Sequence, residues 1–177
     1  MISAPAWSYP DVLIVYDTND TNTQALVAAL AASGATVTLS DTAETGYVGT
    51  NPSPAGFDVV IHLNGTTYTT DMPSAGQTAL VSFVASGGGY IHSEWDAYEY
   101  LNGRMTGMRD LILFDCSSGQ EGTITVTAEV GQENHPVLDF VPASFTFSSG
   151  QNVGSIHSYG GVDDAVVLMT DDSGSDA

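Results

Sequence analysis

A continuous apolar run that ends abruptly in acidic and amide residues constrains the fold of this chain more than any other feature. Val12–Tyr16 is rich in β-branched side chains and is followed at once by Asp-Thr-Asn-Asp. A short run without polar alternation is typical of a strand buried on both faces, which is the position of a central strand in a parallel sheet. The sequence therefore predicts an open α/β sheet around this strand.

Helices and further strands alternate along the first half of the chain. We expect one helix over Thr21–Ser33, capped by Asp20 or by its own first residue. We expect a second helix between Thr70 or Asp71 as its cap and Gly87 at its end, where a left-handed residue is needed. The other expected elements of this half are strands at Ala35–Ser40, Val59–Leu63 and Tyr90–His92 and a loop at Asp41–Phe57.

The second half of the chain has a different pattern. Ile124–Val130 alternates Thr with apolar residues, which is typical of a half-exposed antiparallel strand, and another strand is expected at Ala165–Thr170. The whole pattern predicts an α/β fold: an open, mostly parallel sheet with helices on both faces and antiparallel additions in the C-terminal part. We expect a single domain over residues 1–170 and an acidic Gly/Ser/Asp tail over residues 171–177.

The charge balance excludes several classes of partner. The 177 residues include two Arg, no Lys and 21 acidic residues, for a net charge of −19. Such a surface repels nucleic acid and anionic lipid, because binding to phosphate needs Lys and Arg. No apolar run is long enough for a membrane span. The composition suits an extracellular protein, whose signal peptide is absent from this chain, or the cytoplasm of a halophile.

Polar residues follow the expected strands where open α/β sheets bind their ligands. We therefore assign ligand binding to a set that lies at or just after the strand ends: Asp17, Asn19, Asn64, Ser93, Trp95 and Tyr98. The ligand expected there is a small molecule such as a sugar.

Three polar residues alternate in the stretch that follows the fourth strand. On an extended segment His92, Glu94 and Asp96 would face one way and could grip one cation. Carboxylates favour Ca²⁺, Mg²⁺ or Mn²⁺, whereas imidazole favours Zn²⁺ or Mn²⁺. In an enzyme, His92 and Glu94 would be the catalytic pair. The alternative is that His92 caps the strand while the two carboxylates are solvated.

Two other interpretations concern the same stretch. Ser93 makes a poor nucleophile, because a tight nucleophile elbow needs small residues two positions away on either side, where this chain has Ile91 and Trp95. Trp95, Tyr98 and Tyr100, together with Tyr68, could form an aromatic platform for a sugar ring. The alternative is ordinary packing of the aromatic rings within the loop.

Several segments occur in the order and spacing of a known family. "VLIVYD", "FDVVIHLNGT", "ALVSFVASGGGYIHSE" and "NHPVLDFVP" resemble the ThuA-like domains of the class I glutamine-amidotransferase-like superfamily, over about residues 11–142. The most specific piece is a helix that ends in "FVASGGG" and is followed at once by a short strand. The resemblance implies a flavodoxin-like fold and a link to carbohydrate processing.

The chain departs from the catalytic members of that superfamily at one decisive place. Those enzymes carry a nucleophilic Cys at the turn after the fourth strand, where this chain has His92-Ser93-Glu94, and its one cysteine is Cys116. We therefore expect a domain without amidotransferase activity, acting as a carbohydrate-related binding or accessory module of a larger or secreted protein. The alternatives are a metal-assisted hydrolase or isomerase acting on a sugar, and a structural module whose acidic surface binds Ca²⁺ or assembles with other chains or domains.

Overall fold

The computed structural model describes the backbone of residues 9–158 and 166–171, and the side chains of these residues except those at 94, 114–121 and 149–158. The chain forms two compact units, residues 1–111 and residues 112–177. The expectation of a single domain over residues 1–170 stays a prediction, and most of the expected acidic tail lies outside the described residues.

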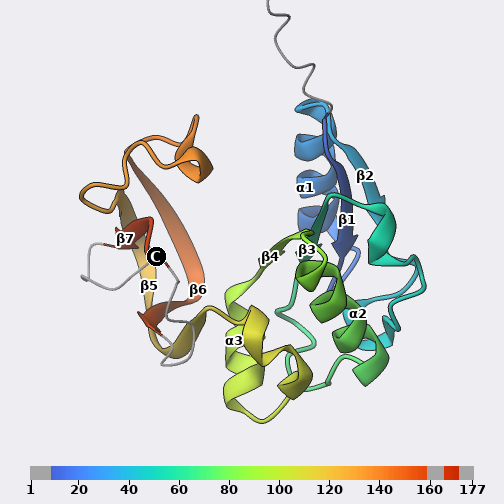
Figure 1. Cartoon of the computed structure of the whole chain (residues 1–177). Coiled ribbons are helices and arrows are strands. Elements are labelled where there is room, and N and C mark those ends of the chain that lie inside the picture. Colours follow the sequence, from blue (N-terminus) through green and yellow to red (C-terminus); the bar gives the residue numbers. More distant parts are fainter. Residues whose placement is uncertain (1–8, 159–165, 172–177) are drawn as a thin grey trace, which may run out of the picture. The chain divides into compact units, whose positions relative to one another are not determined.

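Unit 1 is built on a four-stranded parallel sheet, as the buried apolar runs predict (Figure 1). The strand order is β2-β1-β3-β4, so β1 and β3 are the central strands. Every neighbouring pair is parallel. The strands span Asp11–Val15 (β1), Thr36–Leu39 (β2), Val59–His62 (β3) and Gly89–His92 (β4). Each lies within one residue of its expected place.

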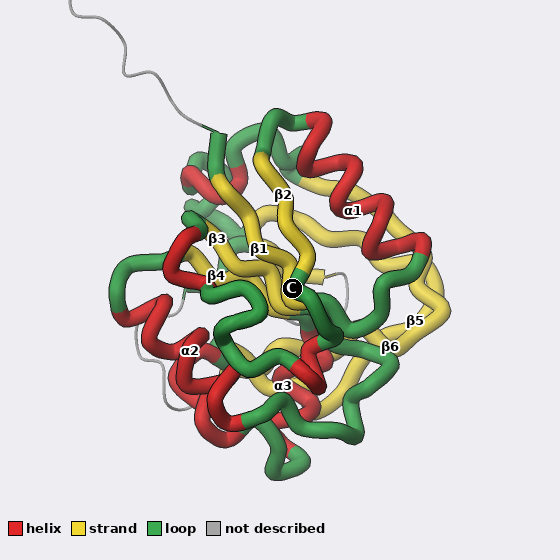
Figure 2. The backbone as a smooth tube through the Cα atoms, turned by 90° about the vertical axis from the view of Figure 1, so that its right-hand side faces the viewer, coloured by secondary structure: helices red, strands yellow, loops and turns green. Residues whose placement is uncertain are grey.

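Helices cover both faces of this sheet, which confirms the predicted fold class. The helices of unit 1 are α1 (Thr21–Ala32), α2 (Ser74–Ala85) and α3 (Glu94–Leu101), with a 3-10 segment η3 at Thr106–Leu111. Leu13 and Val60 belong to the core shared with α2 and η3, whereas Ile14 and Ile61 belong to the core shared with α1. Figure 2 shows α1 and α2 on opposite sides of the sheet.

The caps of the two long helices differ from each other. Asp20 caps α1 as expected, because its carboxylate accepts hydrogen bonds from the backbone N–H groups of Asn22 and Thr23. The expected cap of α2 was wrong: Pro73 occupies the N-cap position. Asp71 instead accepts hydrogen bonds from the Gln77 side chain and from the backbone N–H of Met105, which follows α3. The carboxylate that could have capped α2 is therefore engaged in a tertiary contact.

The segment between β2 and β3 has no α-helix, as expected from its Gly, Pro and Thr content. It contains two single turns of 3-10 helix, η1 (Glu44–Gly46) and η2 (Pro54–Gly56). Tyr47 anchors the segment, because its ring is fully buried in the core and its hydroxyl donates a 2.9 Å hydrogen bond to the Pro52 carbonyl. This segment carries Glu44 to the end of the sheet where β1 and β3 finish.

Unit 2 is a three-stranded antiparallel sheet of order β6-β5-β7. Its strands are β5 (Phe114–Ala128), β6 (Ser144–Ser158) and β7 (Met169–Asp171), with a 3-10 turn η4 (Pro136–Leu138). The expected alternation is confirmed in β5, where Ile124 and Val126 are buried against Met169. The strand β5 begins at Phe114, well before the predicted start at Ile124. Its first part is rich in Gly and Ser, which have low strand propensity, and it pairs with β6 with two register shifts.

Within the described residues, none of the helices is both long and apolar enough to cross a membrane.

A close contact between α2 and the chain just after η1 gives a test of the packing. A Cβ added at Gly76 would overlap the Tyr47 carbonyl oxygen and lie 3.0 Å from the Met72 sulfur. Gly76→Ala should therefore lower the free energy of unfolding by about 1–3 kcal/mol in urea denaturation. Gly56→Ala is the matched control, because its Cβ would enter open space. Helix propensity alone favours Ala by about 1 kcal/mol, so a stabilised Gly76→Ala variant would contradict this packing.

Candidate functional site

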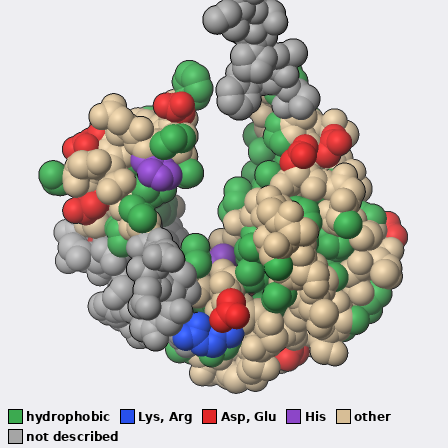
Figure 3. Space-filling view, viewed as in Figure 1, with side chains coloured by type: hydrophobic (Ala, Val, Ile, Leu, Met, Phe, Trp, Pro, Cys, Tyr) green, Lys and Arg blue, Asp and Glu red, His purple; other side chains and the backbone are tan. Residues whose placement is uncertain are grey.

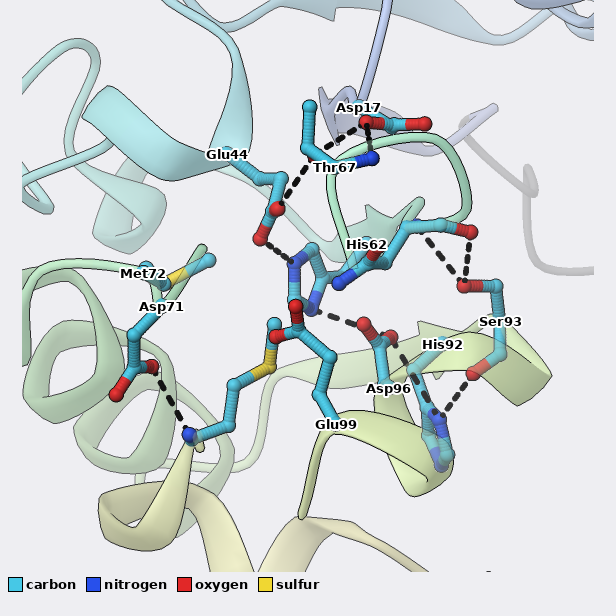
Figure 4. Close-up of polar contacts among 12 residues, drawn as sticks. Asp17, Glu44, His62, Thr67, Asp71, Met72, His92, Ser93, Asp96 and Glu99 are labelled. Atoms are coloured by element: carbon cyan, nitrogen blue, oxygen red, sulfur yellow. Dashed lines mark hydrogen bonds and ion pairs between the residues drawn. The ribbon is translucent and has the colours of Figure 1, made fainter. Parts of the chain in front are cut away.

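The carboxyl ends of the parallel strands bring polar residues from distant parts of unit 1 together (Figure 4). Asp17 follows β1, His62 ends β3, and Asn64 follows it. Within the sheet, β2 is the neighbour of β1 on one side, whereas β3 and β4 lie on the other side of β1. The direction in which successive strands are added therefore reverses between β1 and β3. Open α/β sheets bind ligands outside such a switch point.

Asp17 holds the loop that follows β3. Its carboxylate accepts hydrogen bonds from the backbone N–H groups of Thr66 and Thr67 and from the Thr67 hydroxyl. Asp17 is buried, and only 9% of its surface is exposed. Asn19 is different: it is exposed, and its side-chain oxygen accepts from Gln24 of α1. The structure therefore places Asn19 against α1 and outside this cluster.

His62 is the centre of a fully buried polar network. Its Nε2 atom lies 3.3 Å from Glu44, and its Nδ1 atom lies 2.9 Å from the Tyr90 hydroxyl and 3.3 Å from Asp96. Burial lowers the pKa of His62, although Asp96 and Asp17 oppose that effect. A neutral imidazole has a single N–H, so one ring nitrogen donates and the other accepts.

Glu44 connects His62 to Asp17 through the Thr67 hydroxyl. Thr67 Oγ1 lies 3.0 Å from Glu44 and also donates to Asp17. A hydroxyl has one hydrogen, so it cannot donate to both carboxylates. Burial raises the pKa of Glu44 to about 8, with Asp17 and Asp71 adding to the rise. A protonated Glu44 satisfies the geometry, because it donates to Thr67 while Thr67 donates to Asp17.

Two more buried carboxylates come from α3. Asp96 and Glu99 are both 0% exposed and lie one helical turn apart. Burial raises the pKa of Asp96 to about 7 and that of Glu99 to about 8. Arg104 lies 3.6 Å from Glu99. On the surface, Figure 3 shows basic and acidic side chains next to each other. None of the four side-chain oxygens of Asp96 and Glu99 accepts a hydrogen bond of good geometry from a described residue.

The expectation that His92, Glu94 and Asp96 lie on one extended segment was wrong. The helix α3 begins at Glu94, because a chain leaving the sheet satisfies its backbone N–H groups most simply by helical hydrogen bonds. The helical turn still brings Asp96 to 3.7 Å from His92, at the i,i+4 spacing. His92 Nδ1 also lies 3.0 Å from the Ser93 carbonyl, and burial lowers the pKa of His92 to about 4.

The binding of a metal ion by His92, Glu94 and Asp96 stays a prediction. The side chain of Glu94 lies outside the described residues. Among the side chains that are described, no group of three or more His, Cys, Asp or Glu is arranged to hold a metal ion.

Ser93 ties two loops together. Its hydroxyl accepts a 2.9 Å hydrogen bond from the Asn64 backbone N–H and donates a 3.0 Å hydrogen bond to the Asn64 carbonyl. Its backbone has ordinary extended angles, φ −80° and ψ 160°, and lacks the strain of a nucleophile elbow. Both observations agree with the unfavourable neighbours of Ser93 in the sequence. Cys116 belongs to β5 in unit 2, and its side chain is not among those that the structure describes.

Three of the four expected aromatic side chains form a cluster at this edge. The ring of Tyr68 lies 5.0 Å from Trp95 and 5.6 Å from Tyr98, and Trp95 lies 5.2 Å from Tyr98, between ring centroids. All three are half-buried. A Cβ added at Gly65 would lie 3.5 Å from the Asp17 carboxylate and 3.8 Å from Trp95, so the aromatic cluster adjoins Asp17.

Sequence analysis missed several members of the site, including the fully buried Glu44, His62 and Glu99. Glu44 lies in an irregular segment without periodicity, so no local pattern distinguishes it from a solvated acid. Glu99 could have been found, because its i,i+3 spacing from Asp96 places both on one face of a helix. Thr67 could also have been found, because it follows β3 by only five residues.

Comparisons with known proteins support the fold. No protein-family model and no curated protein matches the chain. Among solved structures, a candidate GMP synthase subunit from Thermoplasma acidophilum is similar, with a TM-score of 0.55 and 10% identity. The match covers 91% of this chain and 73% of that one. The chain thus has a fold like that of class I glutamine amidotransferases.

The buried carboxyl groups predict a specific pH dependence of stability. Between the usual pKa of Glu44, 4.5, and its folded value of about 8, the folded protein keeps a proton that the unfolded chain releases. The free energy of unfolding should therefore fall as the pH rises through this interval. Glu44→Gln keeps the neutral form at every pH. At pH 8 it should be more stable than wild type by about 1–3 kcal/mol, and at pH 5 the gap should nearly vanish.

Urea denaturation of both proteins across this pH range measures the effect. Asp110→Asn, which removes the same charge from an exposed position in unit 1, controls for the general loss of negative charge. If Glu44→Gln is less stable than wild type at pH 8, Glu44 is ionised in the folded protein and the proposed proton position is wrong.

Proposed function

We propose that this chain is a carbohydrate-binding domain of the ThuA-like type, without amidotransferase chemistry, that serves as a binding or accessory module of a larger or secreted protein. The observation that carries the proposal is the aromatic cluster of Tyr68, Trp95 and Tyr98 beside the Asp17 carboxylate. Its place at the switch point of the sheet is where a ligand is expected for this fold class.

The chemistry of this edge suits a sugar. Aromatic rings stack on the apolar C–H faces of a pyranose, while carboxylate and amide groups accept hydrogen bonds from its hydroxyls. The Asp17 carboxylate lies next to Trp95, on the other side of Gly65. Asn64 is 6% exposed, and its side-chain amide interacts with the Glu99 carboxyl group without a hydrogen bond of good geometry. A polar ligand or a water could complete the hydrogen bonds of this amide.

The absence of amidotransferase activity is supported by the turn after β4. The residue at the expected nucleophile position is part of His92-Ser93-Glu94, and both hydrogen bonds of the Ser93 hydroxyl are made with Asn64. An activated nucleophile needs a general base within hydrogen-bond distance. Here the hydroxyl is engaged with backbone atoms, in an arrangement that fixes the loop.

A second candidate is an enzyme, a hydrolase or isomerase acting on a sugar. The observation that favours it is Asp96, whose pKa of about 7 suits a general acid or base and which lies between two imidazoles. Against it, Asp96 is fully buried, so substrate could reach it only if α3 moved. Turnover of a bound sugar by wild type, lost in Asp96→Asn while sugar binding remains, would favour the enzyme.

Loss of the aromatic cluster tests the proposal. Binding of neutral mono- and oligosaccharides is first surveyed on a glycan array and then measured by calorimetry. Trp95→Ala should weaken binding about tenfold or more, because the main stacking surface is removed, whereas Trp95→Phe should keep most of it. Tyr9→Ala is the matched control, since Tyr9 is an exposed aromatic residue just before β1, at the opposite end of the strands.

The melting temperature of each variant separates lost binding from lost folding. Equal losses in Trp95→Ala and Tyr9→Ala, or wild-type affinity in a folded Trp95→Ala protein, would contradict a sugar site at this edge.

A further inference from the structure

We propose that protonation of Glu44 is a switch that fixes the loop after β3 (residues 63–73), and with it the place of Tyr68 in the aromatic cluster. While Glu44 is protonated the loop is held and the three rings stay together. When Glu44 ionises the loop loosens and Tyr68 leaves Trp95. This movement needs no ligand, and its consequence for a bound sugar rests on the proposed function, in which the aromatic cluster is the binding surface.

The first argument is the way in which the loop is anchored. Asn64 bonds to the turn after β4 and fixes the start of the loop, and Asp71 bonds to α2 and to the chain after α3 and fixes its end. Between these ends, the loop is tied to other described elements through Asp17 and Glu44. Tyr68 lies in this middle part, so its position depends on those two carboxyl groups.

The second argument is the number of hydrogens at the Thr67 hydroxyl, which lies between two carboxyl groups in Figure 4. Its oxygen is 3.0 Å from Glu44 Oε1 and also bonds to Asp17. The His62 ring lies 3.3 Å from the other oxygen of Glu44, Oε2, which leaves Oε1 for Thr67. A protonated carboxyl group and a hydroxyl supply one hydrogen each. A protonated Glu44 therefore completes a chain of donors that runs through Thr67 to Asp17.

Ionisation of Glu44 breaks this chain. Asp17 acts as an acceptor, because it also receives the backbone N–H groups of Thr66 and Thr67. Two carboxylates then flank one hydroxyl with a single hydrogen, so one carboxylate faces only oxygen lone pairs. The negative charges also repel each other in a buried place, where screening is weak. The contact through Thr67 is therefore weakened, and Tyr68, the next residue, is released.

The groups that surround Glu44 set the pH at which the switch operates. Burial raises the pKa of Glu44 to about 8, and the nearby carboxylates add to the rise. Burial also lowers the pKa of His62, so the imidazole does not offset the charge of an ionised Glu44. The loop should therefore be held at neutral pH and released as the pH rises through about 8. The titratable groups that act on Glu44 or respond to it come from the ends of β1 and β3, from β4, from the start of α2 and from α3: Asp17, His62, Tyr90, Asp71, Asp96 and Glu99.

The fluorescence of Trp95 reports the position of the loop in the intact chain without any ligand. Trp7→Phe leaves Trp95 as the only tryptophan, and this variant serves as the parent. The Tyr68 ring lies 5.0 Å from Trp95 and shields it. Quenching by acrylamide should therefore rise about twofold between about pH 6.5 and about pH 9, with its midpoint near the Glu44 pKa of about 8. The far-UV circular dichroism should stay constant over this range, because the fold remains intact.

Matched variants identify the proton and the residue that transmits it. Glu44→Gln should stay weakly quenched at every pH, because its amide donates to Thr67 without titrating. Thr67→Val keeps the shape of the side chain without the hydroxyl and should abolish the transition, whereas Thr67→Ser should retain it. Glu99→Gln should also retain it, which separates Glu44 from the other buried acid whose pKa is raised to about 8. Asp110→Asn, the exposed control, should leave the transition unchanged.

Several results would overturn the inference. They are a parent without a transition, a transition that persists in Glu44→Gln or Thr67→Val, a transition that is lost in Thr67→Ser or Glu99→Gln, and a transition that coincides with loss of the far-UV signal, since unfolding would then expose Trp95. The affinity for any sugar found on the array should fall about twofold or more from pH 7 to about pH 9, and should stay constant in Glu44→Gln.

The switch and the proposed function fail separately. A transition in a chain that binds no sugar would refute the proposed function and leave the switch in place. Sugar binding by a chain without the transition would refute the switch and leave the proposed function in place.

Discussion

The buried imidazole of His62 is the contact on which the polar end of unit 1 depends. It ends a central strand, and groups from three other elements converge on it: Glu44 from η1, Tyr90 from β4 and Asp96 from α3. A buried polar side chain is costly unless it is hydrogen-bonded, so each of these contacts fixes the position of the element that supplies it. The irregular segment after β2 and the helix after β4 are thereby held at the same edge.

The same end of the sheet collects acidic groups in a chain that has very few bases. Buried carboxylates usually pair with Arg or Lys, but here burial raises the pKa of Glu44, Asp96 and Glu99 into the neutral range. Protons thus take the place of basic side chains at Glu44 and Asp96, while Glu99 also has Arg104 at 3.6 Å. Groups that gain and lose protons near neutrality occur often at functional sites, although structural networks can have the same property.

The fold is like that of class I amidotransferases, and the turn after β4 carries His92-Ser93-Glu94. Proteins with the same fold often have different functions, because the sheet provides the switch point while the loops provide the reacting groups. In this chain the turn after β4 provides a hydroxyl that joins two loops, and the neighbouring aromatic side chains offer a surface for a ligand. These groups are the basis of the proposed binding role.

The sequence by itself determined the parallel sheet and the edge where the polar residues gather. Buried runs such as Val12–Tyr16 specify central strands, and parallel strands must end on one edge, so Asp17, Asn64 and Ser93 were predictable from local pattern and chain order. The aromatic residues after β4 were identified in the same way. Asn19 lies outside this cluster, because its side chain has a partner in α1.

Only the tertiary structure decided what the site contains. Glu44 comes from a segment without periodicity, and its burial depends on Tyr47 anchoring that segment in the core. The pairing of His92 with Asp96 arises from a helical turn where alternation suggested an extended chain. The pKa of each buried acid depends on desolvation and on neighbours distant in sequence. These are long-range effects, whereas strand and helix patterns are short-range, and for that reason the edge could be predicted but its chemistry could not.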